Sequence, residues 1–223
     1  MDLNGWMNEA FIKSKGPQKH HNRVVDRDGQ AFDTFDSCSS GHAMKNRIYF
    51  IGGASASGKS TIAKELSNLY ALPVVELDRF YDILMQMIFD REKLVIATEK
   101  ISLEVVEQFL AVEASCIIEG GWIQPKKANQ LKKESKGHFY PVYCGYPTAS
   151  VESRYLAIKK SGVHWLNSQS KKEARSFLIS QIKESEHYRQ ECEKWRIEFF
   201  DFTEFSEGSR ILRSHFEQWL RGG

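Results

Sequence analysis

Cysteine is scarce in this sequence, and its spacing excludes two classes of protein. The 223-residue chain has four cysteines, Cys38, Cys116, Cys144 and Cys192, which are far apart and form no C-x-x-C pair. Small disulfide-stabilised proteins and structural zinc sites both need closely spaced cysteines. We therefore expect reduced thiols and neither a disulfide framework nor a zinc site.

Long apolar runs and a strong net charge are also missing. No uninterrupted apolar run approaches the roughly 20 residues of a membrane helix, and the amino terminus lacks the apolar core of a signal peptide. The 31 Lys and Arg residues nearly balance the 29 Asp and Glu residues, which gives no case for binding nucleic acid or an anionic membrane. We expect a soluble, cytoplasmic protein with small-molecule partners, and the sequence leaves its oligomeric state open.

The length suits one α/β domain with an appendage. Residues 1–44 are polar, with histidines, glycines and scattered aromatic residues that follow no sustained period. We expect this segment to be a leader, either flexible or introduced in cloning. Residues 45–223 are expected to form a single domain.

A glycine-rich segment between an apolar run and a helical pattern is the strongest motif. Residues 53–60 match the phosphate-binding P-loop spacing G-x-x-x-x-G-K-[ST]. In such loops the backbone N–H groups surround the phosphates, the lysine reaches the β- and γ-phosphates, and the hydroxyl binds Mg²⁺. We expect a nucleoside triphosphate to be bound by Gly53, Ala54, Ser55, Ala56, Ser57, Gly58, Lys59, Ser60 and Thr61.

Strand-like and helical patterns alternate after residue 45. Strands are predicted at 48–51, 74–77, 115–118, 139–144 and 198–200. Helical periodicity appears at 62–70, 103–110, 151–158, 170–182 and 211–219, and Ser170 with Glu173 forms a capping-box signature. Such alternation predicts an α/β fold with a parallel sheet covered on both faces.

Two carboxylates follow predicted strands, Asp78 after the second and Glu119 after the third. Ligands of parallel sheets bind beyond the carboxyl ends of the strands, so we expect both side chains near Lys59. Beside a Mg²⁺-bound triphosphate, one carboxylate can support the metal and the other can accept a proton from an attacking hydroxyl. Ser60, Asp78 and Glu119 are therefore the candidate metal-associated residues.

These motifs together resemble P-loop small-molecule kinases of the adenylate kinase and uridine kinase type. The resemblance rests on the P-loop and on the runs Leu77-Asp78-Arg79-Phe80-Tyr81 and Ile118-Glu119-Gly120-Gly121. It implies a three-layer sandwich with five parallel strands, the P-loop strand in the centre, a helical lid, and ATP with Mg²⁺ as the donor system. It also implies that Asp78 is the base for a hydroxyl and that Glu119 occupies the Mg²⁺-associated acidic position.

The lid, placed at about residues 150–175, should supply cations to the migrating phosphoryl group. Guanidinium groups suit phosphate better than ammonium groups, so Arg154 and Arg175 are the selected candidates. The other basic residues of this region are Lys159, Lys160, Lys171 and Lys172.

Several functions are compatible with these motifs. No N-K-x-D guanine-reading run occurs, which argues against a G protein. The favoured hypothesis is ATP- and Mg²⁺-dependent phosphoryl transfer to a hydroxyl of a nucleoside, sugar or phosphoglycerate-like acid, with catalytic residues Lys59, Asp78, Glu119, Arg154 and Arg175. The alternatives are a nucleoside monophosphate kinase in which Arg79 or Arg91 holds the acceptor phosphate, a nucleic-acid 5′-hydroxyl kinase, and an ATP-binding regulatory module.

Overall fold

The computed structural model describes residues 24–25, 31–32, 47–162 and 164–221, and the chain divides into two units, Met1–His42 and Ala43–Gly223. In the first unit, β1 (Val24–Val25) and β2 (Ala31–Phe32) pair as antiparallel strands. The rest of the predicted leader, within residues 1–44, lies outside the described residues.

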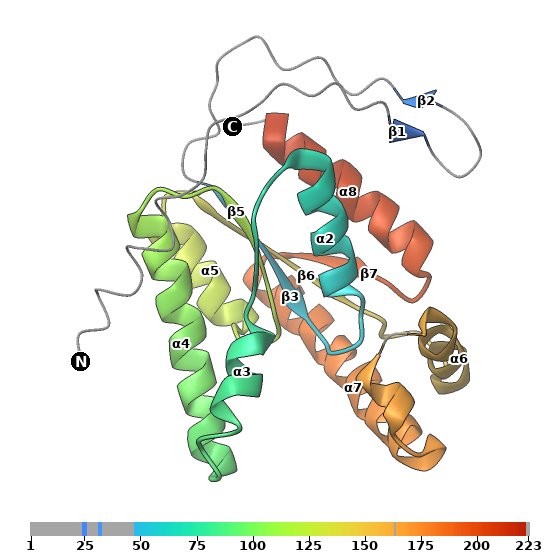
Figure 1. The fold of residues 1–223 in the computed structure, drawn as a ribbon. Coiled ribbons are helices and arrows are strands. Elements are labelled where there is room, and N and C mark those ends of the chain that lie inside the picture. Colours follow the sequence, from blue (N-terminus) through green and yellow to red (C-terminus); the bar gives the residue numbers. More distant parts are fainter. Residues whose placement is uncertain (1–23, 26–30, 33–46, 163, 222–223) are drawn as a thin grey trace. The chain divides into compact units, whose positions relative to one another are not determined.

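The second unit is built on a sheet of five parallel strands in the order β4-β5-β3-β6-β7 (Figure 1). The central strand β3 pairs with β5 on one side and β6 on the other, and all of its residues are buried. The predicted α/β fold with a central P-loop strand is confirmed. The strands are β3 (Ile48–Gly53), β4 (Val74–Glu76), β5 (Cys116–Glu119), β6 (Phe139–Gly145) and β7 (Glu198–Asp201).

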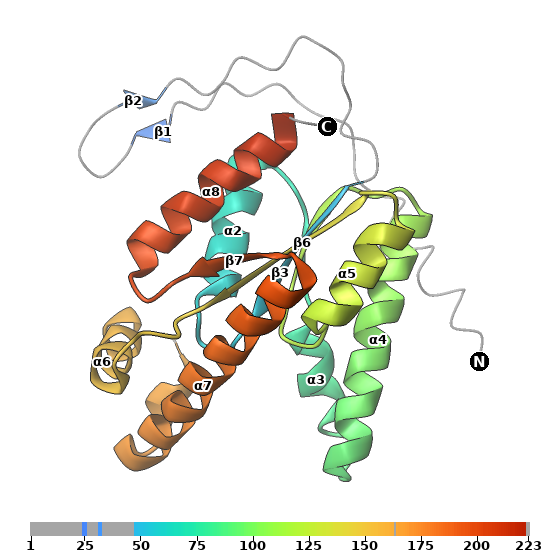
Figure 2. The same ribbon diagram turned by 180° about the vertical axis from the view of Figure 1, so that it is seen from behind.

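Helices cover both faces of the sheet and give three layers (Figures 1 and 2). Successive side chains of a strand point to opposite faces, so Tyr49 and Ile51 pack against α2 and α8, whereas Ile48 and Phe50 pack beneath α4, α5 and α7. The covering helices are α2 (Lys59–Tyr70), α4 (Arg91–Ala111), α5 (Pro125–Glu134), α7 (Lys171–Trp195) and α8 (Phe205–Arg221).

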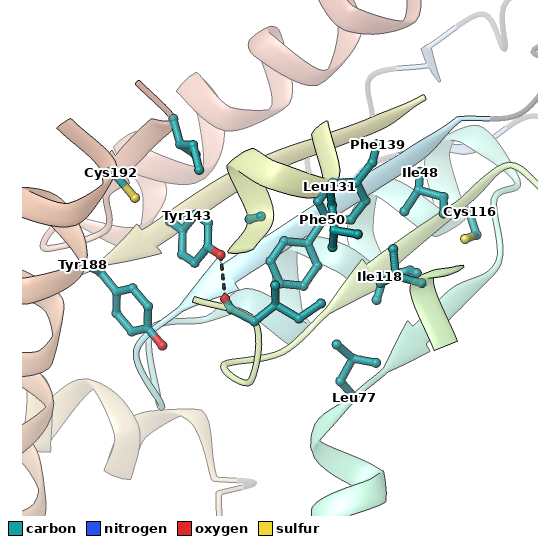
Figure 3. Close-up of a cluster of buried hydrophobic side chains, with 14 of the residues drawn as sticks. Ile48, Phe50, Leu77, Cys116, Ile118, Leu131, Phe139, Tyr143, Tyr188 and Cys192 are labelled. Carbon is teal, nitrogen blue, oxygen red and sulfur yellow. Dashed lines mark hydrogen bonds between the residues drawn. The ribbon is translucent and has the colours of Figure 1, made fainter. Parts of the chain in front are cut away.

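The apolar cluster under α4, α5 and α7 reaches the edge of the sheet where the strands end. Figure 3 shows Phe50 and Tyr143 inside it, with ring centroids 5.8 Å apart. Tyr143 is fully buried, and its hydroxyl donates to the carbonyl of Ile123 at 2.6 Å. This bond fixes the segment that follows β5, which carries part of the candidate site.

Three short helices lie near the carboxyl ends of the strands: α3 (Asp78–Leu84), α6 (Val151–Ser161) and the 3₁₀ helix η1 (Trp165–Ser168). The latter two and the start of α7 occupy the range predicted for the lid. They share a small apolar cluster that includes Leu166 and Leu178. The mobility expected of a lid stays a prediction.

Two helices differ from the sequence patterns. α5 was not predicted, because its first turn and surface are rich in lysine and only Pro125, Ala128 and Leu131 are buried. The apolar residues after Asp78 predict a helix that contributes to the core or to the wall of a substrate pocket. α3 ends at Leu84, none of its residues is buried, and Phe80 packs partly buried against the core cluster. The prediction of core residues in this segment is wrong, and the pocket wall stays a prediction.

The start of α7 follows the sequence signal. Ser170 Oγ accepts from the backbone N–H of Glu173, and the Glu173 carboxylate accepts from the backbone N–H of Ser170 at 3.1 Å. This reciprocal pair satisfies two helix-terminal donors and confirms the predicted capping box.

Within the described residues, no helix combines the length and the apolar character that crossing a membrane requires.

Shortening a side chain between α8 and the sheet should destabilise the fold. Phe216 is fully buried, and its ring meets Tyr49 edge-on with centroids 4.7 Å apart. We expect Phe216→Ala to lower the free energy of unfolding by about 3–5 kcal/mol, as large-to-small core changes do, measured by urea unfolding. Ile211→Ala on the same helix is the control, because Ile211 is 44% exposed, and equal losses in the two variants would contradict the packing described.

Candidate active site

The P-loop leaves β3 in a conformation that needs glycine at its ends. Gly53, Ala56 and Gly58 have positive φ values of 125°, 58° and 104°. A β-carbon on Gly53 would lie 1.9 Å from the carbonyl oxygen of Cys144, and one on Gly58 would lie 2.5 Å from the Phe205 ring. These contacts explain why the first and last glycines of the motif are required here.

The loop opens directly into the amino terminus of α2. No side chain caps the first turn of this helix, and no acidic residue lies in it. The first N–H groups of a helix are unpaired within the helix and carry its positive dipole end, so they form a binding site for anions. Residues 53–61 therefore have the geometry predicted for them, although the site itself stays a prediction.

Lys59 begins α2 and folds back over the loop. Its side chain is 5% exposed, and Nζ donates to the carbonyl of Ala54 at 2.8 Å. Lys59 takes part in none of the ion pairs found among the described residues. Its charge is therefore available to a phosphate group.

Glu119 ends β5 beside the P-loop and is 1% exposed. Ser60 Oγ donates to its Oε1 at 2.9 Å, whereas Oε2 has no hydrogen-bond partner among the described residues. Burial raises the pKa of Glu119, the charges of Asp78 and Glu76 raise it further, and Lys59 and Ser60 oppose the shift. A hydroxyl oxygen and an unpaired carboxylate oxygen are ligands that Mg²⁺ accepts, so these residues fit a Mg²⁺ ion.

Asp78 begins α3 at the same edge of the sheet. Its Oδ1 accepts from the backbone N–H of Gly121 at 3.4 Å. A β-carbon on Gly120, which has φ 155°, would lie 2.8 Å from the Leu77 β-carbon. The segment after β5 can thus approach Asp78 closely, and the structure brings Asp78 and Glu119 together near Lys59.

Tyr188 of α7 holds the segment that follows β5. Its hydroxyl donates to the carbonyl of Gly121 at 3.0 Å and accepts from Gln124 Nε2 at 3.3 Å. Sequence reasoning missed this residue because nothing in the local pattern of α7 indicates contact with a segment some 67 residues away.

Gln181, also on α7, was missed in the same way. Its Oε1 accepts from the backbone N–H of Ser55 at 2.8 Å, and the Tyr146 hydroxyl donates to the carbonyl of Ser55 at 2.9 Å. The P-loop is thus held from both α7 and the segment after β6.

Arg154 lies against the P-loop rather than free on a lid. It is 8% exposed, and its guanidinium donates to the carbonyl of Ala56 and, at 3.5 Å, to that of Phe202. The group also lies over the Tyr146 ring, 4.3 Å from its centroid. Burial lowers the pKa of Arg154 from its usual value.

Within the described part of the chain, no contact joins Arg175 to the P-loop. It forms an ion pair with Glu152, which joins α7 to α6. The side chains of Lys159 and Lys171 lie over the ring of Tyr155. The assignment of a cation for the migrating phosphoryl group therefore stays open among these residues.

No protein-family model matches the sequence, and no curated protein matches it. Solved structures do match. Shikimate kinase from Bacteroides thetaiotaomicron superposes with a TM-score of 0.54 at 13% identity over 77% of this chain and 98% of that one. Two further matches are weaker. A gluconokinase from Sinorhizobium meliloti 1021 has a TM-score of 0.46 at 16% identity over 78% of this chain and 97% of that one. Shikimate kinase from Acinetobacter baumannii in complex with shikimate has a TM-score of 0.46 at 18% identity over 78% of this chain and 95% of that one.

The first of these matches confirms the fold of a P-loop small-molecule kinase. At such low identity a structural likeness establishes the fold and leaves the reaction to be argued from the site. The chain thus has the fold of P-loop kinases such as shikimate kinase.

Adding one methyl group to the first P-loop glycine should be far more costly than adding one to a glycine in open space. Gly137 also has a positive φ, 89°, but no atom lies within 4 Å of a β-carbon placed there. We expect Gly137→Ala to cost about 1–2 kcal/mol for the left-handed backbone alone, and Gly53→Ala to cost more because the Cys144 backbone must move. Urea unfolding compares the two, and a smaller loss in Gly53→Ala would contradict the close approach.

The buried carboxyl of Glu119 should make stability depend on pH. Because its folded-state pKa is raised, it contributes stability below the unfolded pKa of about 4.3, and this contribution is lost as pH rises through the folded pKa. Glu119→Gln should therefore be more stable than the native chain at pH 7 to 8, with a difference that shrinks towards pH 4. Thermal unfolding across this range tests it, and a difference independent of pH would show that the pKa of Glu119 is not raised.

Proposed function

We propose that this protein is an ATP- and Mg²⁺-dependent kinase that phosphorylates a hydroxyl group of a small metabolite. One observation carries the proposal: the carboxylates of Glu119 and Asp78 lie at the edge of the sheet where β3 ends and the P-loop begins, and the buried Glu119 Oε2 has no partner among the described residues. A carboxylate beside the triphosphate can act as the base for an acceptor hydroxyl, which nucleotide binding alone does not require. The fold shared with shikimate kinase supports the same class of reaction.

In this proposal each residue has one role. The loop amides and Lys59 hold the β- and γ-phosphates, and Ser60 and Glu119 hold Mg²⁺. The bound ion would supply charge neutralisation for the phosphates and orient them. Arg154 keeps the loop in shape through the Ala56 carbonyl.

Asp78 acts as the base. The acceptor oxygen forms a bond to the γ-phosphorus as the bond from that phosphorus to the β–γ bridging oxygen breaks, ADP leaves, and the hydroxyl proton passes to Asp78. The Gly121 N–H orients the Asp78 carboxylate for this transfer. A phosphate acceptor would need no base, so Asp78 favours a hydroxyl acceptor over a nucleoside monophosphate.

The nucleoside monophosphate alternative loses support at one of its two arginines. Arg79 Nε donates to Glu76 Oε2 at 3.0 Å, and its Nη1 lies 3.9 Å from Asp82. The Arg79 side chain is 67% exposed, and it would have to give up these contacts to hold an acceptor phosphate.

Radiolabelled ATP with Mg²⁺ and pooled nucleosides, sugars and hydroxy acids tests the proposed function. We expect a labelled product that the Lys59→Ala variant does not form. Asp78→Asn should lower kcat by about 10²–10⁴ and leave ATP affinity unchanged, because Asp78 acts on the acceptor.

Asp82→Asn is the matched control, since Asp82 lies one turn further along α3 and is 59% exposed. Its kcat should be close to that of the native chain. ATP binding without product from any pool would favour a regulatory module, and full activity of Asp78→Asn would refute the assignment of the base.

A further inference from the structure

One face of α3 and the segment after β5 form an aromatic wall beside Asp78. Tyr81 and Met85 follow Asp78 at helical spacing, and the Met85 N–H donates to the Tyr81 carbonyl at 2.9 Å. The rings of Tyr81 and Trp122 stack with centroids 4.8 Å apart and planes 19° apart. Trp122 directly follows Gly121, whose N–H contacts Asp78. The stacked rings thus belong to residues next to the proposed base along α3 and the segment after β5, and Met85 lies one turn beyond Tyr81.

The indole N–H of Trp122 is buried and has no acceptor among the described residues. A buried donor without a partner costs free energy of about 1–3 kcal/mol, so such groups in native proteins call for an explanation. An oxygen atom of a bound compound would satisfy this donor.

The apolar character of the wall continues past α3. Met85, Met87 and Phe89 are 50%, 72% and 94% exposed. Exposed large apolar side chains that cluster mark surfaces that bind another molecule. These three residues follow directly on the helix that carries Asp78.

The charges on this side of the site are acidic. From Asp78 to Phe89 the single cation is Arg79, and it is engaged by Glu76 and Asp82. On the opposite side, burial and then the charges of Glu184 and Asp78 raise the pKa of Tyr188, which places a further carboxylate near the segment after β5. A carboxylate or phosphate held against this segment would meet the carboxylates of Asp78 and Asp82, and the one cation of the segment is already engaged by carboxylates.

We infer that the acceptor is a hydroxyl compound with an aromatic or apolar body and no anionic group, bound by Tyr81, Trp122 and Met85. The inference rests on the proposed function, because it concerns the acceptor of that reaction.

Binding is measured first, with two compounds that differ in one group. 1,4-Benzenedimethanol and 4-(hydroxymethyl)benzoate are titrated into the full chain in the presence of a non-hydrolysable ATP analogue and Mg²⁺, and heat of binding is recorded. We expect the neutral diol to bind at least about tenfold more tightly, which is a typical loss for an unpaired charge in a site. Equal binding or tighter binding of the benzoate would overturn the inference.

Turnover then separates the inference from the proposed function. The same pair is assayed with labelled ATP, together with nucleosides and their 5′-monophosphates. Labelled product that forms from the neutral compounds, and that the Lys59→Ala variant does not form, would support both the acceptor class and the kinase function. Product mainly from the anionic compounds would refute the inferred acceptor class but would still support the kinase function. Selective binding of the diol with no product from any compound would refute the kinase function but would still support the inferred binding site.

Two variants and a control assign the selectivity to the wall. Tyr81→Ala should weaken binding of the diol by about tenfold or more, as loss of an aromatic contact does, and ATP affinity should not change. Met85→Arg should shift the preference by about tenfold towards the benzoate, because it adds a cation at an exposed position. Ile179→Ala, at a 47% exposed residue of α7, should leave the preference unchanged, and an unaltered preference in Met85→Arg would contradict the assignment.

Discussion

Burying the Glu119 carboxylate beside the P-loop costs free energy, and the neighbouring residues offset this cost only in part. Glu119 is 1% exposed, receives one hydrogen bond from Ser60, and keeps one oxygen without a partner among the described residues. The charge of Lys59 offsets some of the cost. Buried charges of this kind are tolerated when they are paired or coordinate a metal. In the proposed function Mg²⁺ would pair with this oxygen, and the cost of burying the carboxylate would serve that function.

The P-loop is held in place from outside, so that its inner surface stays available to a ligand. Arg154 and Tyr146 donate to loop carbonyls, and Gln181 accepts from the Ser55 amide. These side chains come from α6, from the segment after β6 and from α7; α7 packs against β6 and β7, and α6 packs against α7. A loop held in this way loses little conformational freedom on binding. The contacts of the folded protein already order the loop, so little of the free energy of ligand binding is lost to ordering it.

The parts of the structure that were predictable are those with local causes. The five strands follow from apolar runs, the P-loop from its spacing, and the start of α7 from the Ser170–Glu173 pair. The unpredicted helix α5 buries three residues among lysines, too few to give a clear periodic signal. The contacts of Gln181 and Tyr188 join residues 126 and 67 positions apart, and only the folded arrangement creates them. Arg154 was identified as a site residue, but its contact with the loop carbonyl depends on how α6 packs.

Helix α7 runs without interruption from the lid region into the core. Ala174 and Leu178 belong to the small cluster of α6 and η1, Gln181 contacts the P-loop, and Tyr188 and Cys192 lie in the core under the sheet. An uninterrupted α-helix of 25 residues behaves as a stiff rod over this length. If the end of α7 that carries Ala174 moves, either the helix bends or the movement is transmitted to the Ser55 amide and the Gly121 carbonyl. The P-loop and the segment after β5 are thus mechanically linked through α7.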